Sequence, residues 1–71
     1  MASKECKALG RAIRRFRTKC GWTQQMLADH AELTRESISA IENGRFDPTF
    51  STLCRIAQAF DLGLEELLKG F

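Results

Sequence analysis

The sequence has few cysteines, one histidine and no long apolar run among its 71 residues. Its three cysteines, Cys6, Cys20 and Cys54, are far apart and odd in number, which fits neither a disulfide framework nor a CxxC metal site. Together with His30 they make four potential zinc ligands, but no two of them have the spacing of a metal-binding pair. We therefore expect no metal, no cofactor and free or structural thiols.

Membrane segments and catalytic motifs are also missing. No apolar stretch approaches the roughly 18 residues of a membrane span, and the polar start, M-A-S-K-E-C-K, lacks the apolar region of a signal peptide. No Gly-rich phosphate loop follows a strand, and no motif pairs a nucleophile with a base. We expect a cytoplasmic protein that is not an enzyme, has no small-molecule substrate and does not bind a membrane. Its length predicts one small domain, residues 1–71, and a chain this short is often helped by dimerisation.

Basic residues are concentrated at one end of the chain. Residues 1–22 hold seven Lys or Arg and one acid, whereas residues 23–71 hold four basic and eight acidic residues. The net charge of +2 therefore hides an electropositive end, which suits an anionic partner. A solvated helix face would produce the same asymmetry.

Apolar residues recur at helical spacing and show no β-type alternation, so the pattern predicts an all-α fold with five helices. The apolar stripe of the first predicted helix, residues 4–19, consists of Leu9, Ile13, Phe16 and Cys20. Gly21 suits the end of this helix. So basic a helix could also lie on an anionic membrane or dock into a partner's groove, but a chain this short needs the stripe for its core.

Two short helical patterns lie between Trp22 and Gly44. Thr23 is a candidate N-cap for a helix that ends near Asp29, with Leu27 and Ala28 facing inward. After a turn over residues 30–33, a further helix runs to about residue 42. Helices joined so closely must cross at a steep angle, so residues 23–42 or so predict a helix-turn-helix.

The second of these helices has its own boundary signals. Thr34 is its candidate N-cap, and Asn43-Gly44 ends it because both residues tolerate a left-handed backbone. Its predicted buried residues are Leu33, Ile38 and Ile41.

Two more helices are predicted within residues 49–69. Pro48 cannot continue a preceding helix, and Thr49 can cap the next one. The apolar stripe of that helix consists of Leu53, Ile56, Ala57 and Phe60. Residues 61–63 break it, and a last helix, residues 64–69, has an apolar face of Leu64, Leu67 and Leu68.

The ordered set of these residues resembles the lambda-repressor-like helix-turn-helix regulators, also called XRE-like or Cro/repressor-like. The resemblance covers about residues 9–68. It rests on Leu9-Gly10-x2-Ile13-Arg14-x2-Arg17, Gly21-Trp22-Thr23-Gln24-x2-Leu27-Ala28, Ala31-x-Leu33-Thr34-Arg35-x2-Ile38-Ser39-x-Ile41-Glu42-Asn43-Gly44-Arg45 and Pro48-Thr49-x3-Leu53-x2-Ile56-Ala57. It implies a compact five-helix domain whose second and third helices form the DNA-binding motif.

The resemblance also implies which residues contact DNA phosphates. Gln24 lies at the N-terminus of the second helix, where unpaired N–H groups and the helix dipole attract phosphate. Asn43 would present its amide to a phosphate, and Arg45 and Arg14 are further phosphate candidates. Gln24 could instead be a solvated first-turn residue, and Asn43 could be only a helix C-cap or serve both roles.

The third helix should enter the major groove with Thr34, Arg35, Glu36 and Ser39 facing the bases. Arg35 can donate to guanine O6 and N7, and Glu36 can accept from cytosine N4, each contact being worth roughly 1–3 kcal/mol of discrimination. Arg35 could instead bind only phosphate. Glu36 would weaken binding unless it is paired with Arg35 or with a cytosine.

The resemblance implies an ion pair between Arg17 and Glu42 that joins the first and third helices. The sequence also departs from the family at two positions. Glu32 stands where a turn glycine is usual, so either it takes a positive φ or the turn differs. Trp22 replaces a smaller aliphatic residue and is expected to cover the core at the domain edge, the alternative being a role at the surface.

The function implied is sequence-specific regulation of transcription through double-stranded DNA. A homodimer would read a palindromic operator, and some of the apolar residues Phe46, Phe50 and Phe71, with the last helix, would form its interface. The alternative is a protein-interaction module of the same fold, such as an antitoxin or antirepressor partner, which would bind a protein through its basic helix or its apolar C-terminal face.

Overall fold

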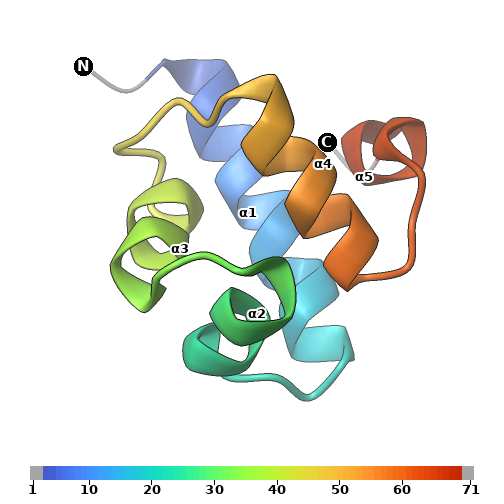
Figure 1. The fold of residues 1–71 in the computed structure, drawn as a ribbon. Helices are drawn as coiled ribbons and strands as arrows, with labels where there is room; N and C mark the ends of the chain where they lie inside the picture. Colours follow the sequence, from blue (N-terminus) through green and yellow to red (C-terminus); the bar gives the residue numbers. More distant parts are fainter. Residues whose placement is uncertain (1–2, 70–71) are drawn as a thin grey trace.

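Helices account for most of the residues that the computed structural model describes, residues 3–69, and no strand occurs among them. In chain order they are α1 (Lys4–Lys19), α2 (Gln24–Ala31), α3 (Arg35–Glu42), α4 (Phe50–Ala59) and α5 (Leu64–Lys69), shown in Figure 1. The all-α prediction with five helices is confirmed. Within these residues no helix is both long enough and apolar enough to span a bilayer.

Threonine side chains begin the three middle helices. The hydroxyls of Thr23, Thr34 and Thr49 each accept a hydrogen bond from the backbone N–H three residues further on, over 3.1–3.2 Å. Each bond satisfies an N–H group that has no partner inside its helix, and such a cap stabilises a helix by about 1 kcal/mol. All three predicted caps are confirmed.

Left-handed residues end the helices. Gly21 and Gly44 have φ values of 73° and 71°, as their places after α1 and α3 predict. α2 runs to Ala31, two residues beyond the predicted end near Asp29, because its reversal comes at Glu32. Glu32 takes φ 57° and ψ 44° without being glycine, so of the two alternatives for this turn the positive φ is the one found.

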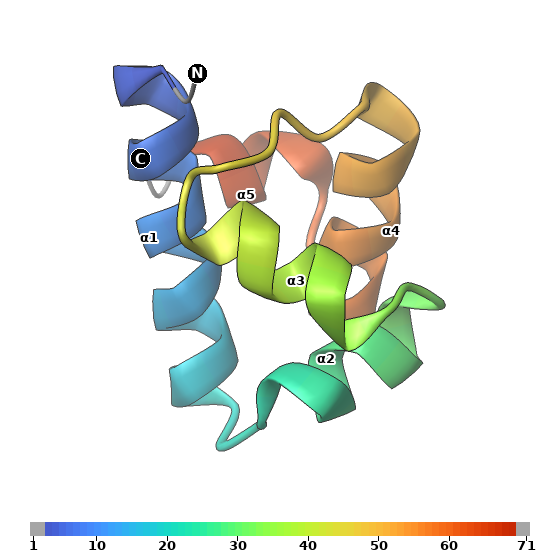
Figure 2. The ribbon, with the colours of Figure 1, turned by 90° about the vertical axis from the view of Figure 1, so that its left-hand side faces the viewer.

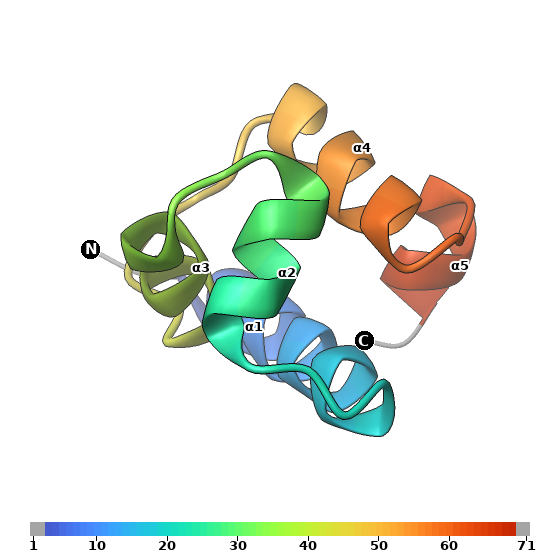
Figure 3. The same cartoon turned by 60° about the horizontal axis from the view of Figure 1, so that its bottom comes forward.

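Helix α3 packs against both α1 and α2, and α5 packs against α1 and α4 to close the far side (Figure 1). Figure 2 shows α3 on the outer face, with α1 and α4 on either side and α5 behind. Figure 3 shows α2 between α3 and α4, and it packs against both. This arrangement leaves one side of α3 uncovered.

The core lies among all five helices. Its buried apolar residues are Leu9, Ala12, Ile13, Leu27, Ala28, Ala31, Ile38, Ile41, Ile56, Ala57 and Leu67. Phe16, Leu33, Leu53, Phe60 and Leu64 are half-buried and pack against this core.

Two expected core positions are wrong. Cys20 is exposed because α1 has already ended at Lys19, which leaves Cys20 as the C-cap. Leu68 is 36% exposed because Leu67 is the residue of α5 that points into the core.

Candidate nucleic-acid interface

The N-terminal half of α3 is held at the surface by its own buried face. Ile38 and Ile41 are 0% and 1% exposed and anchor the helix in the core. On the other side Thr34, Arg35 and Glu36 are exposed. One helix thus combines a fixed base with a row of polar side chains directed outward.

The four predicted base-contacting residues lie together, but each has a different environment. Arg35 and Glu36 side chains are 53% and 79% exposed, and Arg35 Nη2 lies 3.7 Å from Glu36 Oε2. The Thr34 hydroxyl serves the N-cap and donates to Ser37 Oγ over 2.9 Å. Ser39 is half-buried, and its hydroxyl and carbonyl oxygens both accept from Asn43. The pairing of Glu36 with Arg35 offsets part of the negative charge on this surface.

A buried ion pair holds α3 against α1. Arg17 donates to Glu42 through Nε at 2.6 Å and through Nη2 at 3.1 Å, and the Glu42 side chain is 0% exposed. Nη1 of Arg17 also donates to the Trp22 carbonyl over 2.7 Å, so the same guanidinium holds the α1–α2 connection. The predicted pair is confirmed. A two-pronged arginine–carboxylate contact of this kind fixes relative orientation as well as distance.

Two predicted phosphate-contacting residues meet at the same carboxylate. Gln24 Nε2 donates to Glu42 Oε1 over 3.1 Å, and Arg14 Nε donates to that oxygen over 3.4 Å. The Arg14 side chain is 50% exposed and Gln24 is half-buried. Glu42 therefore accepts from side chains of α1 and α2 at once. The sequence gives no signal for the Gln24 bond beyond the polar character of both residues.

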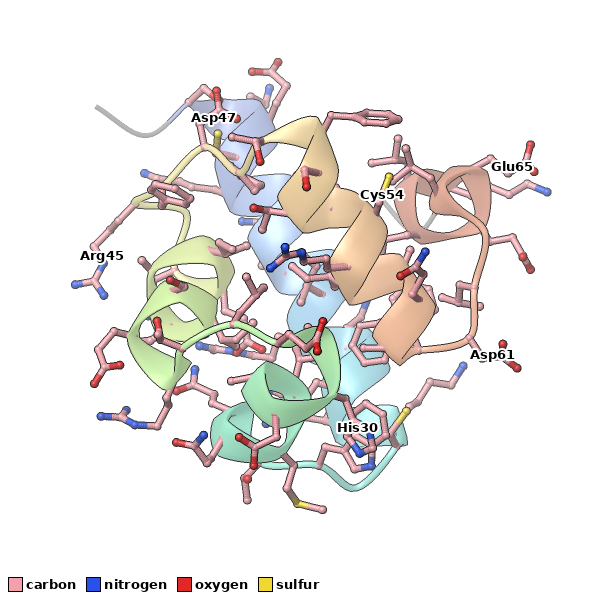
Figure 4. All side chains as sticks on the ribbon, in the orientation of Figure 1. His30, Arg45, Asp47, Cys54, Asp61 and Glu65 are labelled. Atoms are coloured by element: carbon pink, nitrogen blue, oxygen red, sulfur yellow. The ribbon has the colours of Figure 1, made fainter. Side chains whose placement is uncertain are left out.

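The remaining two phosphate candidates follow α3. The Asn43 amide turns back and donates to the Ser39 carbonyl over 2.8 Å, which is a C-cap contact. Arg45 is exposed and extends outward from the loop after α3, on the opposite side of the molecule from the acidic Asp61 and Glu65 (Figure 4). The acidic side chains of Asp61 and Glu65 thus lie away from the exposed side of α3 (Figure 4).

Two contacts brace the turn and the end of α2. Trp22 is half-buried and stacks on His30, with ring centroids 4.3 Å apart, and on Phe60 at 5.7 Å. The expectation that Trp22 covers the core edge is confirmed. Arg55 of α4 donates to the Glu32 carbonyl over 3.3 Å, a contact that was not predicted because it joins residues 23 apart in sequence.

The fold and this exposed helix define the class of protein: a small helix-turn-helix domain with one side of its third helix exposed. Residues 13–67 match the profile of the family described as helix-turn-helix. The chain belongs to this family, in its XRE-type branch. The resemblance found in the sequence is thereby confirmed.

Within residues 3–69 no cluster of three or more His, Cys, Asp or Glu residues could hold a metal ion.

Relatives of known name are regulators. The chain is 37% identical over 59 residues to the competence pilus inhibition repressor of Acinetobacter baylyi, a match that covers 83% of this chain and 54% of that protein. It is 42% identical over 55 residues to an HTH-type transcriptional regulator of Methanothermobacter thermautotrophicus, covering 78% of this chain and 77% of the relative. The chain thus spans about half the length of the Acinetobacter repressor.

Solved structures agree in fold. The restriction-modification controller protein C.AhdI from Aeromonas hydrophila superposes with a TM-score of 0.89 at 26% identity, covering 92% of this chain and 98% of the controller. The clp gene regulator ClgR from Corynebacterium glutamicum gives a TM-score of 0.88 at 26% identity, covering 99% of this chain and 74% of the regulator. The similarity therefore extends over nearly the whole chain.

Proposed function

We propose that residues 1–71 act as one sequence-specific unit that binds double-stranded DNA and regulates transcription, with α3 in the major groove. The observation that carries the proposal is the exposed N-terminal half of α3 above a buried ionic anchor. Thr34, Arg35 and Glu36 face outward, while Glu42 and Arg17 fix the helix that carries them. A groove-reading helix needs this combination, because side chains discriminate bases only when their backbone is held in register.

Arg35 and Glu36 supply the proposed base contacts, together with Thr34 and Ser39. Adjacent arginine and glutamate suit neighbouring G·C pairs, since Arg35 donates to guanine O6 and N7 and Glu36 accepts from cytosine N4. Their separation of 3.7 Å in the free protein is long for a hydrogen bond. Little interaction energy is lost when both side chains turn to bases.

Phosphate contacts would fix the register of the domain on DNA. Gln24 lies at the N-terminus of α2, where the helix dipole favours a phosphate. Arg14, with a side chain 50% exposed, and the exposed Arg45 are cations available to phosphates. The Asn43 amide already donates one N–H group to the Ser39 carbonyl. It can contact a phosphate only by breaking this hydrogen bond or by donating its second N–H group to the phosphate.

A homodimer on a palindromic operator is part of the proposal. Phe46 and Phe50 are 47% and 70% exposed, and Leu68 is 36% exposed. Large apolar side chains exposed to solvent indicate a surface that another protein covers, and here we propose a second copy of the chain. Phe71, the third predicted interface residue, lies outside the described residues. Two-fold symmetry would place the recognition helices about 34 Å apart, one turn of DNA.

The test is selection of bound sites from a random duplex pool, followed by titrations at two salt concentrations. We expect an enriched palindrome and an affinity that falls steeply with salt, because phosphate contacts release counterions. Arg11→Ala is the matched control for Arg35→Ala, since each removes one exposed guanidinium. Loss of selectivity in the Arg35 variant alone supports the proposal, whereas a pool without enrichment refutes it.

A second candidate function rests on the exposed Phe50. If this side chain and the α5 surface bind another protein, the fold acts as an interaction module of the antitoxin or antirepressor kind. The two candidates separate on one result: an interaction module shows no enriched DNA site, and Phe50→Ser, not Arg35→Ala, abolishes its partner binding.

A further inference from the structure

We infer that Glu42 is a positioning residue for DNA binding, whose buried carboxylate orients the Gln24 amide toward a phosphate. This inference rests on the proposed function, because it names what prepares one phosphate contact of that interface. This positioning role is separate from the structural role of Glu42, which joins α3 to α1 through the ion pair with Arg17.

The geometry of the amide carries the inference. Gln24 Nε2 lies 3.1 Å from Glu42 Oε1 and so directs one of its two N–H groups at the carboxylate. Within residues 3–69 the second N–H group has no acceptor. Because an amide NH2 group is planar, fixing one N–H also fixes the direction of the other. Gln24 is half-buried, so part of this residue remains accessible to a ligand at the surface.

The charge balance at Glu42 makes such a role compatible with phosphate. A lone carboxylate beneath a phosphate would repel it, but Arg17 and Arg14 both donate to Glu42. The three side chains together carry a net charge of +1, so the cluster attracts an anion. A glutamine that is already held also loses less side-chain freedom on binding DNA than a freely rotating one.

The neighbouring Gln25 provides a matched control. It carries the same amide, is exposed, and donates through Nε2 to Asp29 Oδ1 over 2.9 Å within α2. Gln25 is therefore held by a carboxylate as well, but by one that belongs to its own helix and has no contact with Glu42.

The experiment is a double-mutant cycle on the affinity for the selected site, with Gln24→Ala, Glu42→Gln and the double variant. Folding of each variant is checked by circular dichroism below its melting temperature. A hydrogen bond to a charged group predicts that Gln24→Ala weakens binding about tenfold. Glu42→Gln alone should weaken binding about fivefold. In the Gln24→Ala background the same substitution should weaken binding less than twofold, because the effects of substitutions at interacting residues are not additive. In the Gln25→Ala background the Glu42 effect should remain about fivefold.

Equal losses from Glu42→Gln in the Gln24 and Gln25 backgrounds would overturn the inference and leave Glu42 with a structural role only. Should the Glu42 variant not fold, Gln24→Asn decides the question without touching the ion pair. Its shorter side chain cannot reach Glu42 and a phosphate together, so it should bind as weakly as Gln24→Ala; wild-type affinity would overturn the inference. These outcomes presuppose a wild-type protein that binds DNA, so a wild type that selects no site refutes the proposed function instead.

Discussion

The crossing of α1 over α3 depends on the absence of a side chain at Gly10. A Cβ atom placed there would lie 2.4 Å from the Ile41 carbonyl oxygen and 2.6 Å from that of Glu42. Both neighbours are backbone atoms of α3, so neither can move aside by rotating a side chain. In Gly10→Ala the two helices must separate by about 1 Å to restore ordinary van der Waals contact.

The expected net effect is a loss of about 2 kcal/mol in the free energy of unfolding. Overpacking of a rigid contact costs up to about 3 kcal/mol. Against this, alanine inside a helix is about 1 kcal/mol more favourable than glycine. For a domain of this size each kcal/mol corresponds to roughly 4–8 °C, so the melting temperature should fall by about 8–16 °C.

Thermal and urea unfolding followed by circular dichroism measure this change. Gly63→Ala is the matched control, because a Cβ there meets nothing closer than 3.5 Å and its φ is not positive. We expect it to stay within about 0.5 kcal/mol of the wild type. If Gly10→Ala is as stable as the wild type, the helix gain outweighs the clash and the close α1–α3 contact does not limit stability.

Four further substitutions test the α3 cap, the turn at Glu32, the buried ion pair and the exposed Phe50. Thr34→Ala should destabilise the protein by about 1 kcal/mol through loss of the α3 cap, measured by urea unfolding; no change would mean that the cap is replaced by water. Glu32→Gly should stabilise it by about 1 kcal/mol in the same assay, because glycine takes a left-handed φ without strain; a loss would show that the Glu32 side chain contributes more than the strain. Glu42→Ala should lower stability by about 3–5 kcal/mol, because it leaves a buried arginine unpaired; a loss below about 1 kcal/mol would contradict the role of the pair. Phe50→Ser should leave the melting temperature nearly unchanged but weaken self-association in sedimentation experiments, whereas unaltered self-association would remove Phe50 from the interface.

The local features of this fold could be predicted because they depend on neighbouring residues. Threonine followed by a helical apolar pattern identifies a cap, and the caps at Thr23, Thr34 and Thr49 are all present. The periodicity of apolar residues likewise identified most of the core. It failed at Cys20 and Leu68, because periodicity alone does not tell where a helix ends or how far the core extends over its last turn.

Contacts that depend on helix crossing were less accessible. The Arg17–Glu42 pair was expected only through the family resemblance, since residues 25 apart carry no local signal of their contact. The Gln24–Glu42 and Arg55–Glu32 hydrogen bonds were not predicted at all. Each requires the relative placement of two helices to within the length of a hydrogen bond.

Reading of bases by α3 can be measured through the base preferences of the wild type and of Arg35→Ala at the selected site. Affinities are measured for that site and for each single base-pair substitution within one half-site, at fixed salt. We expect Arg35→Ala to lose about 1–3 kcal/mol of discrimination at one G·C pair and to keep its preferences elsewhere, while Arg11→Ala leaves the pattern of base preferences unchanged. An Arg35→Ala variant with an unchanged pattern of base preferences would contradict base reading by α3.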